Sequence, residues 1–212
     1  TLVYTLSLHD ALPISLLVAI PMGIVVSVAA TREGRGTRAA EVLLTAPLAV
    51  SGIVLGLGML QTLVFGTTVF GRRLTVTGPV AIVAAHAVAA YPFVSRSVTP
   101  ALRSVDDRLG EAARSLGADR TTVLTDVELP LVAPALVAGA AFAFAISVGE
   151  FDSTVLLAEG VDTATMPVAL ERYTDDRSIG PSLGPATAMG TVLLAVTTVS
   201  FVLIDRVGGM WE

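Results

Sequence analysis

The segment from Thr99 to Leu136 decides the fold, and it reads "TPALRSVDDRLGEAARSLGADRTTVLTDVELPLVAPAL". Its first half predicts one amphipathic helix, because apolar residues recur at steps of three and four along Leu102, Val105, Leu109, Ala112 and Leu116. Gly117 permits a sharp turn after this helix, and Asp119 can cap a second short helix. Leu129-Pro130 should end that second helix, with Pro130 opening the next apolar run. The segment therefore predicts a helix-turn-helix with an apolar face.

The composition around this segment is that of a membrane protein. Of the 212 residues, 53% are hydrophobic and 15% are charged, whereas soluble domains carry about 25% charged residues. The mean hydropathy is +0.78. The chain has no cysteine, which excludes disulfides and thiolate metal sites.

Five apolar segments are candidates for membrane spans, and they lie near residues 16–30, 42–65, 76–94, 130–157 and 186–204. The first is shorter than the roughly 20 residues that a spanning helix needs. We therefore expect an all-α membrane protein, a polytopic bundle of five transmembrane helices. The helix-turn-helix interrupts this bundle as a long connection over residues 97–130.

Arginine placement predicts the orientation. If the spans alternate, one side holds nine arginines, in the first connection, the long connection and the tail, and the other side holds four. The positive-inside rule places residues 97–130 and the C-terminus in the cytoplasm and the start of the fragment outside, so we expect at least one upstream helix to be missing. An amphipathic helix-turn-helix outside the membrane suits a protein partner.

Seven positions of the long connection keep a fixed spacing: Glu111-Ala112-Ala113, then Gly117, then Val127 and Leu129-Pro130. With these residues the chain resembles the inner-membrane permeases of ATP-binding-cassette importers. The resemblance implies that this loop is a coupling helix that docks in a groove of a separate ATPase subunit. It further implies that Glu111 pairs with a basic group or free backbone amides there; the alternative is an ordinary solvated residue. The chain has no Gly-rich phosphate loop, so we expect no enzyme activity and no cofactor in this subunit.

The same resemblance implies the other partners: an extracytoplasmic substrate-binding protein, a second permease subunit or half, and the lipid bilayer, with no nucleic acid. Two further stretches, "AFAFAISVGEFDSTVLLAEG" and "TMPVALERY", are similar to thiamine and iron(III) permeases and, more distantly, to molybdate and sulfate permeases. The expected substrate is therefore thiamine or iron(III), ahead of molybdate or sulfate.

The N-terminal stretch "TLSLHDALPI", Thr5 to Ile14, resembles the translation of a common sequencing adapter. No Lys or Arg precedes Arg32, so a signal peptide does not fit. A His-Asp pair is also costly in a membrane helix. We expect residues 1–15 to be an artefact without a packing role, and residues 16–212 to be an N-terminally truncated permease domain.

Polar residues in or near the spans are the remaining site candidates. Glu150 and Asp152 follow Pro130 by about 20 residues, which places them at the outer interface. Three roles are open for them there: an outer gate, a contact with the binding protein, or simple anchoring of the helix at the interface. An outer segment carries four charged residues: Arg172, Asp175, Asp176 and Arg177. This segment is the expected docking surface for the binding protein; the alternative is an ordinary solvated segment. His86 lies mid-span, where an interhelical hydrogen bond is favoured over a substrate role.

Two other classes of protein are alternatives. A secondary, ion-coupled transporter is expected to show acids or broken helices near mid-membrane, and the predicted spans are nearly devoid of acids. An enzyme needs a nucleophile with its base, or a metal cluster. The sequence offers neither, so no catalytic residue and no metal site is predicted.

Overall fold

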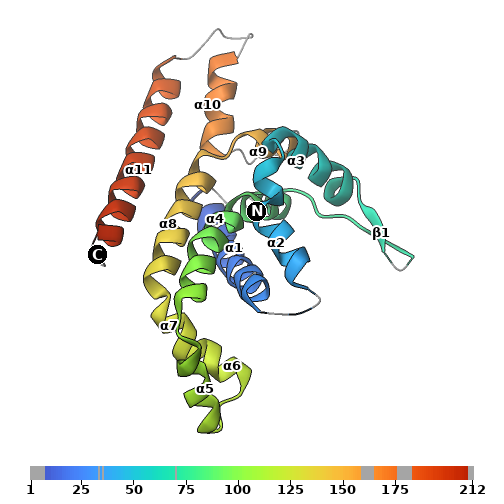
Figure 1. The fold of residues 1–212 in the computed structure, drawn as a ribbon. Helices are drawn as coiled ribbons and strands as arrows, with labels where there is room; N and C mark the ends of the chain where they lie inside the picture. Colours follow the sequence, from blue (N-terminus) through green and yellow to red (C-terminus); the bar gives the residue numbers. More distant parts are fainter. Residues whose placement is uncertain are drawn as a thin grey trace.

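The computed structural model describes residues 8–32, 34, 36–69, 71–158, 165–175 and 183–209, and most of these residues are helical (Figure 1). The long helices are α1 (Leu8–Thr31), α4 (Pro79–Ser104), α8 (Ala133–Gly149) and α11 (Leu183–Gly209). The shorter elements are α2 (Thr37–Ala49), α3 (Gly52–Met59), the π-helical turn η2 (Leu60–Val64), β1 (Thr67–Val69), β2 (Arg72–Leu74), α5 (Asp107–Ser115), α6 (Arg120–Val123), the π-helical turn η3 (Leu124–Glu128), α7 (Leu129–Leu131), α9 (Asp152–Leu157) and α10 (Met166–Asp175). The predicted all-α class is confirmed, with one small antiparallel hairpin, β1–β2, added to it.

Among the described residues, three helices are long and apolar enough to cross a membrane, over residues 14–31, 79–104 and 184–206. Two bent helix pairs pass the same test, 37–49 with 52–64 and 120–131 with 133–149. Counting each pair as one span gives the five expected spans. The helices α5 and α6 lie at one end of the molecule, and α3, α9 and α10 lie toward the other (Figure 1).

The span expected over residues 42–65 is present as a bent pair, because the chain turns by 110° between α2 and α3. Val50 and Ser51 are both extended at this break. Pro47, inside α2, has no N–H to donate to the carbonyl four residues earlier. That carbonyl, of Leu43, accepts a hydrogen bond from the Tyr91 hydroxyl instead, at 2.8 Å. A neighbouring helix thus satisfies the carbonyl that Pro47 leaves free in α2.

The expected span over residues 130–157 is also interrupted. Leu129-Pro130 does not stop the preceding helix, which continues to Leu131 and then bends by 76° into α8. Pro130 cannot bond to the carbonyl of Asp126, and the preceding turn widens into the π-helical η3. At its far end α8 stops at Gly149, and the separate helix α9 starts at Asp152.

The third span and the start of the long connection differ from expectation as well. Helix α4 continues to Ser104, so residues 97–104 of the predicted loop belong to the span. The predicted single helix from Leu102 to Leu116 is divided, because Val105 is extended and α5 begins only at Asp107.

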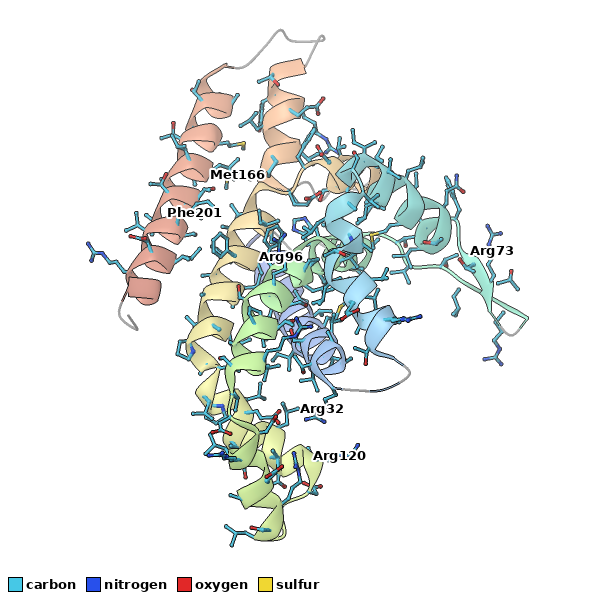
Figure 2. The ribbon with its side chains drawn as sticks, in the orientation of Figure 1. Arg32, Arg73, Arg96, Arg120, Met166 and Phe201 are labelled. Atoms are coloured by element: carbon cyan, nitrogen blue, oxygen red, sulfur yellow. The ribbon has the colours of Figure 1, made fainter. Side chains whose placement is uncertain are left out.

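Helices α1, α4 and α8 pack through small residues, which let helix backbones approach closely. Val94 of α4 is fully buried and lies between glycines of both neighbours. A Cβ on Gly23 of α1 would stand 2.6 Å from the Val94 Cβ, and a Cβ on Gly139 of α8 would stand 3.0 Å from its Cα. Helix α11 joins this group through a T-shaped pair, Phe142 with Phe201, whose ring centroids are 5.7 Å apart (Figure 2).

The first helix begins at Leu8, earlier than the expected span. Ser15 is fully buried, and its hydroxyl lies 3.2 Å from that of Ser147. The expectation that residues 1–15 have no packing role is therefore wrong at its last residue; their origin as an adapter stays a prediction.

Candidate functional site

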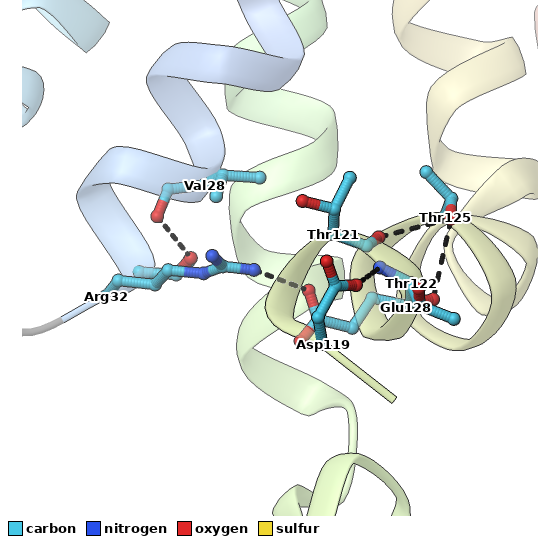
Figure 3. Close-up of polar contacts among 8 residues, drawn as sticks. Val28, Arg32, Asp119, Thr121, Thr122, Thr125 and Glu128 are labelled. Carbon is cyan, nitrogen blue, oxygen red and sulfur yellow. Dashed lines mark hydrogen bonds and ion pairs between the residues drawn. The ribbon is translucent and has the colours of Figure 1, made fainter. Parts of the chain in front are cut away.

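The α5–α6 segment forms the predicted helix-turn-helix, and side-chain caps define its two helices. The Asp106 carboxylate accepts a hydrogen bond from the backbone N–H of Arg108 at 2.9 Å, which caps α5. The predicted cap of the second helix is confirmed, since the Asp119 carboxylate accepts from the backbone N–H of Thr122 at 2.8 Å (Figure 3). Asp106 was not identified as a cap from the sequence, although the position just before a helix is a usual one for a capping aspartate.

The turn between the two helices requires glycine. Gly117 has φ +94°, in the left-handed region that other residues adopt only at a cost. Its N–H donates to the Arg114 carbonyl at 3.0 Å, and the next N–H, of Ala118, donates to Ala113 at 3.1 Å. These bonds satisfy the free carbonyls at the end of α5.

The two short helices contact each other through Gly110 and Val123, both of which are buried. A Cβ on Gly110 would stand 3.4 Å from a Val123 methyl group. The loop is also attached to the body of the molecule. Val105 and Leu129, at the two ends of the loop, pack against the core cluster of α1, α4 and α8, beside Leu102 of α4.

An ion pair makes a second attachment to the body. The Arg32 guanidinium, just after α1, lies 3.5 Å from the Glu128 carboxylate of η3 (Figure 3). It is the single ion pair within 4 Å among the residues that the structure describes.

The predicted coupling residues divide by exposure. Glu111, Ala112 and Gly117 are exposed, and Ala113 is half-buried. Val127 and Leu129 are half-buried on the helix that leads to α8, with the exposed Pro130 after them. Two leucines of the predicted apolar stripe face solvent in the single chain, Leu109 at 45% and Leu116 at 90% exposure.

Hydrogen bonds from Thr122 lower the pKa of the exposed Asp119 carboxyl, the bond with the side chain contributing most. The charged form is therefore the one that caps α6. This contribution is fully present above the usual pKa of an aspartate and is lost as the pH falls through the lowered value.

The other predicted region lies at the break between α8 and α9. The Glu150 carboxylate accepts hydrogen bonds from the backbone N–H and the hydroxyl of Ser153, at 2.9 and 2.8 Å. Asp152 is exposed, and its Cβ lies 2.6 Å from where a Cβ on Gly52 would stand. Both acids line a cavity of about 220 Å³ at the α2–α3 bend, together with Phe93 and apolar residues.

His86 forms interhelical hydrogen bonds, as favoured from the sequence. It is 2% exposed. Its Nδ1 lies 2.8 Å from the Ser147 hydroxyl of α8, and its Nε2 lies 3.0 Å from the Thr154 hydroxyl of α9. With Ser15, these residues connect α1, α4, α8 and α9. The sequence carried no signal for this connection, because serine and threonine are common in membrane helices.

The predicted outer docking residues are only partly described. Arg172 of α10 donates to the Ala158 carbonyl at 3.0 Å. Asp175 ends α10, while Asp176 and Arg177 lie outside the described residues. Within the described ranges, no group of three or more His, Asp or Glu is placed to hold a metal ion.

The fold and this loop define a multi-pass helical membrane protein with a capped helix-turn-helix at one end of the molecule. Residues 15–208 match the model of the family described as "Binding-protein-dependent transport system inner membrane component", and the chain belongs to this family. It is similar to the molybdenum transport system permease protein ModB of Escherichia coli (strain K12), 34% identical over 125 residues, 58% of this chain and 53% of that protein.

A second relative and a solved structure extend these similarities. ModB of Mycobacterium tuberculosis is 33% identical over 193 residues, covering 85% of this chain and 71% of that protein. The MetNI methionine ABC transporter, in an inward-facing conformation, matches with a TM-score of 0.69 and 22% identity, over 97% of this chain and 94% of that chain. That match supports the fold. The chain spans about half the length of the Escherichia coli relative.

Proposed function

We propose that this chain is the transmembrane permease subunit of an ATP-binding-cassette importer, and that α5–α6 is its coupling loop. The observation that carries the proposal is the geometry of that loop. Its two helices are capped locally, turn at a left-handed Gly117, and project at one end of the molecule (Figure 1). A rigid element of this kind can pass a movement to α4 and α8, the spans that it joins.

The exposed face of α5 fits a separate ATPase subunit as partner. Leu116 is 90% exposed and Leu109 is 45% exposed in the chain alone, and burying large apolar side chains in a partner's groove is favourable. Glu111 and Ala112 are exposed beside them. The small Ala112 allows a close approach, and Glu111 offers a carboxylate to a basic group.

Glu111→Arg tests this role directly. We expect the reversed charge to reduce co-purification with the cognate ATPase subunit, and to reduce transport-linked ATP hydrolysis in vesicles, by about tenfold, because like charges repel across an interface. The control is Glu41→Arg, which makes the same charge change at an exposed position of α2. Normal ATPase binding and transport by the Glu111→Arg variant would remove the main support for the proposal.

The remaining partners follow from the same proposal: a second permease subunit or half, an extracytoplasmic binding protein, and the bilayer around the spans. The coupling loop and the C-terminus then lie in the cytoplasm. The chain has no cysteine, so a single cysteine at Asp119 reports its side of the membrane. Labelling of that cysteine by an impermeant reagent in intact cells would place the loop outside the cell and contradict the proposed orientation.

For the substrate, we propose a tetrahedral oxyanion, with molybdate first. Support comes from the two relatives reported above, both named as molybdenum permeases. The ranking expected from sequence, thiamine or iron(III) ahead of molybdate or sulfate, finds no support among them. The test is uptake of labelled molybdate into vesicles in the presence of the cognate binding protein. Unlabelled sulfate, thiamine or iron(III) is added in turn as a competitor. Competition by thiamine or iron(III) alone would overturn the oxyanion assignment.

The ion-coupled secondary transporter remains the second candidate because the α2–α3 bend is a broken helix beside two acids, a feature that such transporters use. The family membership weighs against it. Uptake that proceeds without ATP and follows an ion gradient would favour it.

A further inference from the structure

A cavity of about 600 Å³ lies behind the coupling loop. The ends of α1 and α4 form one side of it, and α5, α6 and η3 form the other. Four arginines line it: Arg32, Arg103, Arg114 and Arg120. Figure 2 shows Arg32 and Arg120 at the same end of the molecule, on segments far apart in the sequence.

Two of these arginines have partners within the protein. Arg32 pairs with Glu128 at 3.5 Å, and Arg103 donates to the Ala30 carbonyl at the end of α1 at 3.5 Å. Both therefore hold the walls of the cavity together.

The other two, Arg114 and Arg120, have no hydrogen-bond or ion-pair partner among the described residues. Arg114 folds back over the buried Gly110, since its Nη2 lies 3.1 Å from where a Cβ on Gly110 would stand. Of the remaining acids in the lining, Asp106 is engaged in capping α5, which leaves Asp107. Two free guanidinium groups thus face one free carboxylate, and the unpaired excess is positive.

The position of the cavity indicates which anions can reach it. The first and third candidate spans end at Thr31 and Ser104. Thr31, Leu102 and Arg103 line the cavity. It therefore lies where two spans leave the hydrocarbon. Phospholipid phosphates occupy this level of a bilayer, and arginine binds phosphate oxygens in bidentate geometry.

We propose that this cavity binds a phosphate-bearing anion, held by Arg114 and Arg120. The anion is the headgroup of an acidic phospholipid or free phosphate from solution, since both present the same oxygens.

The experiment uses the full chain in bilayers of phosphatidylcholine with added phosphatidylglycerol, and lipid retained after purification is counted by mass spectrometry. We expect selective retention of phosphatidylglycerol by the unaltered chain. Arg114→Gln with Arg120→Gln should lower that retention roughly tenfold, because two charge-assisted contacts are lost. The matched control is Arg38→Gln with Arg206→Gln, which removes two exposed arginines outside the cavity.

A second measurement separates the two sources of the anion. Inorganic phosphate is titrated against the chain in pure phosphatidylcholine, and binding that depends on Arg114 and Arg120 assigns the site to a free anion. A melting curve in phosphatidylcholine alone shows whether the double variant is folded. Equal loss in the control variant, or no selective binding of either probe, overturns the proposal.

Discussion

The α5–α6 turn and the α8–α9 break both reverse or redirect a helix, yet they are held in different ways. At α5–α6 the contacts are local: Asp106 and Asp119 cap helices two or three residues away, and Gly117 makes the turn. At α8–α9 the main contacts come from distant parts of the chain, as in the bond from His86 to Thr154. The first turn is defined by its own sequence, and the second by the elements packed around it.

This difference has a consequence for mutation. A change in the α5–α6 segment should alter that segment and leave the spans folded. A change at the α8–α9 break should instead affect α3, α4 and α9 together.

The largest effect is expected at Gly56 of α3. A Cβ there would stand 2.7 Å from the backbone Cα of Ser153 in α9, and backbone cannot move aside as a flexible side chain can. Gly56→Val should destabilise the protein by about 3 kcal/mol through overpacking, measured by thermal unfolding in detergent. Gly58→Val is the control on the same helix, because nothing lies within 4 Å of its Cβ position. Equal losses in both variants would mean that the α3–α9 contact is not what holds the break.

The next effect is expected at His86. His86→Ala removes the bonds to Ser147 and Thr154 and leaves buried hydroxyls without that partner, which should cost about 2 kcal/mol. Thr154→Val keeps the shape and removes one bond, so its loss should be about half as large. Unfolding of the two single variants and the double variant gives a coupling energy. Additive losses would show that His86 does not connect α4 to α9.

The same two regions differ in how well they could be predicted from the sequence. The α5–α6 helix-turn-helix could be predicted because Gly117 and Asp119 act on their neighbours in the chain. The bend at Val50 and the break before Asp152 could not, because they depend on contacts between α3 and α9 and on Tyr91 satisfying the carbonyl that Pro47 frees. The length of α4 was underestimated because the span was ended near residue 94, where the apolar run gives way to Arg96, although the helix continues past Pro100 to Ser104.

A smaller effect is expected at Gly117. A β-branched residue at φ +94° is strained by about 1–2 kcal/mol, so Gly117→Val should distort the turn and uncouple transport from ATP hydrolysis. Gly117→Asn is the matched control, since asparagine tolerates the left-handed region. The unfolding temperature of the spans should stay the same in both variants. If Gly117→Val lowers it as much as Gly56→Val does, the α5–α6 segment is not independent of the body.

The smallest effect is expected at the Arg32–Glu128 ion pair, which joins the two kinds of region. Its atoms are 3.5 Å apart, and the two side chains are 41% and 23% exposed, so solvent screens the attraction and the pair should contribute about 0.2–1 kcal/mol. The charge swap Arg32→Glu with Glu128→Arg should recover most of what either single variant loses, and the coupling energy should shrink at high salt. A coupling energy well above about 1 kcal/mol would contradict the view that α5–α6 is held by local contacts. The position of the loop would then depend on α1 rather than on its own caps and turn. A value near zero would instead leave the packing of Val105 and Leu129 as the attachment of the loop to the spans.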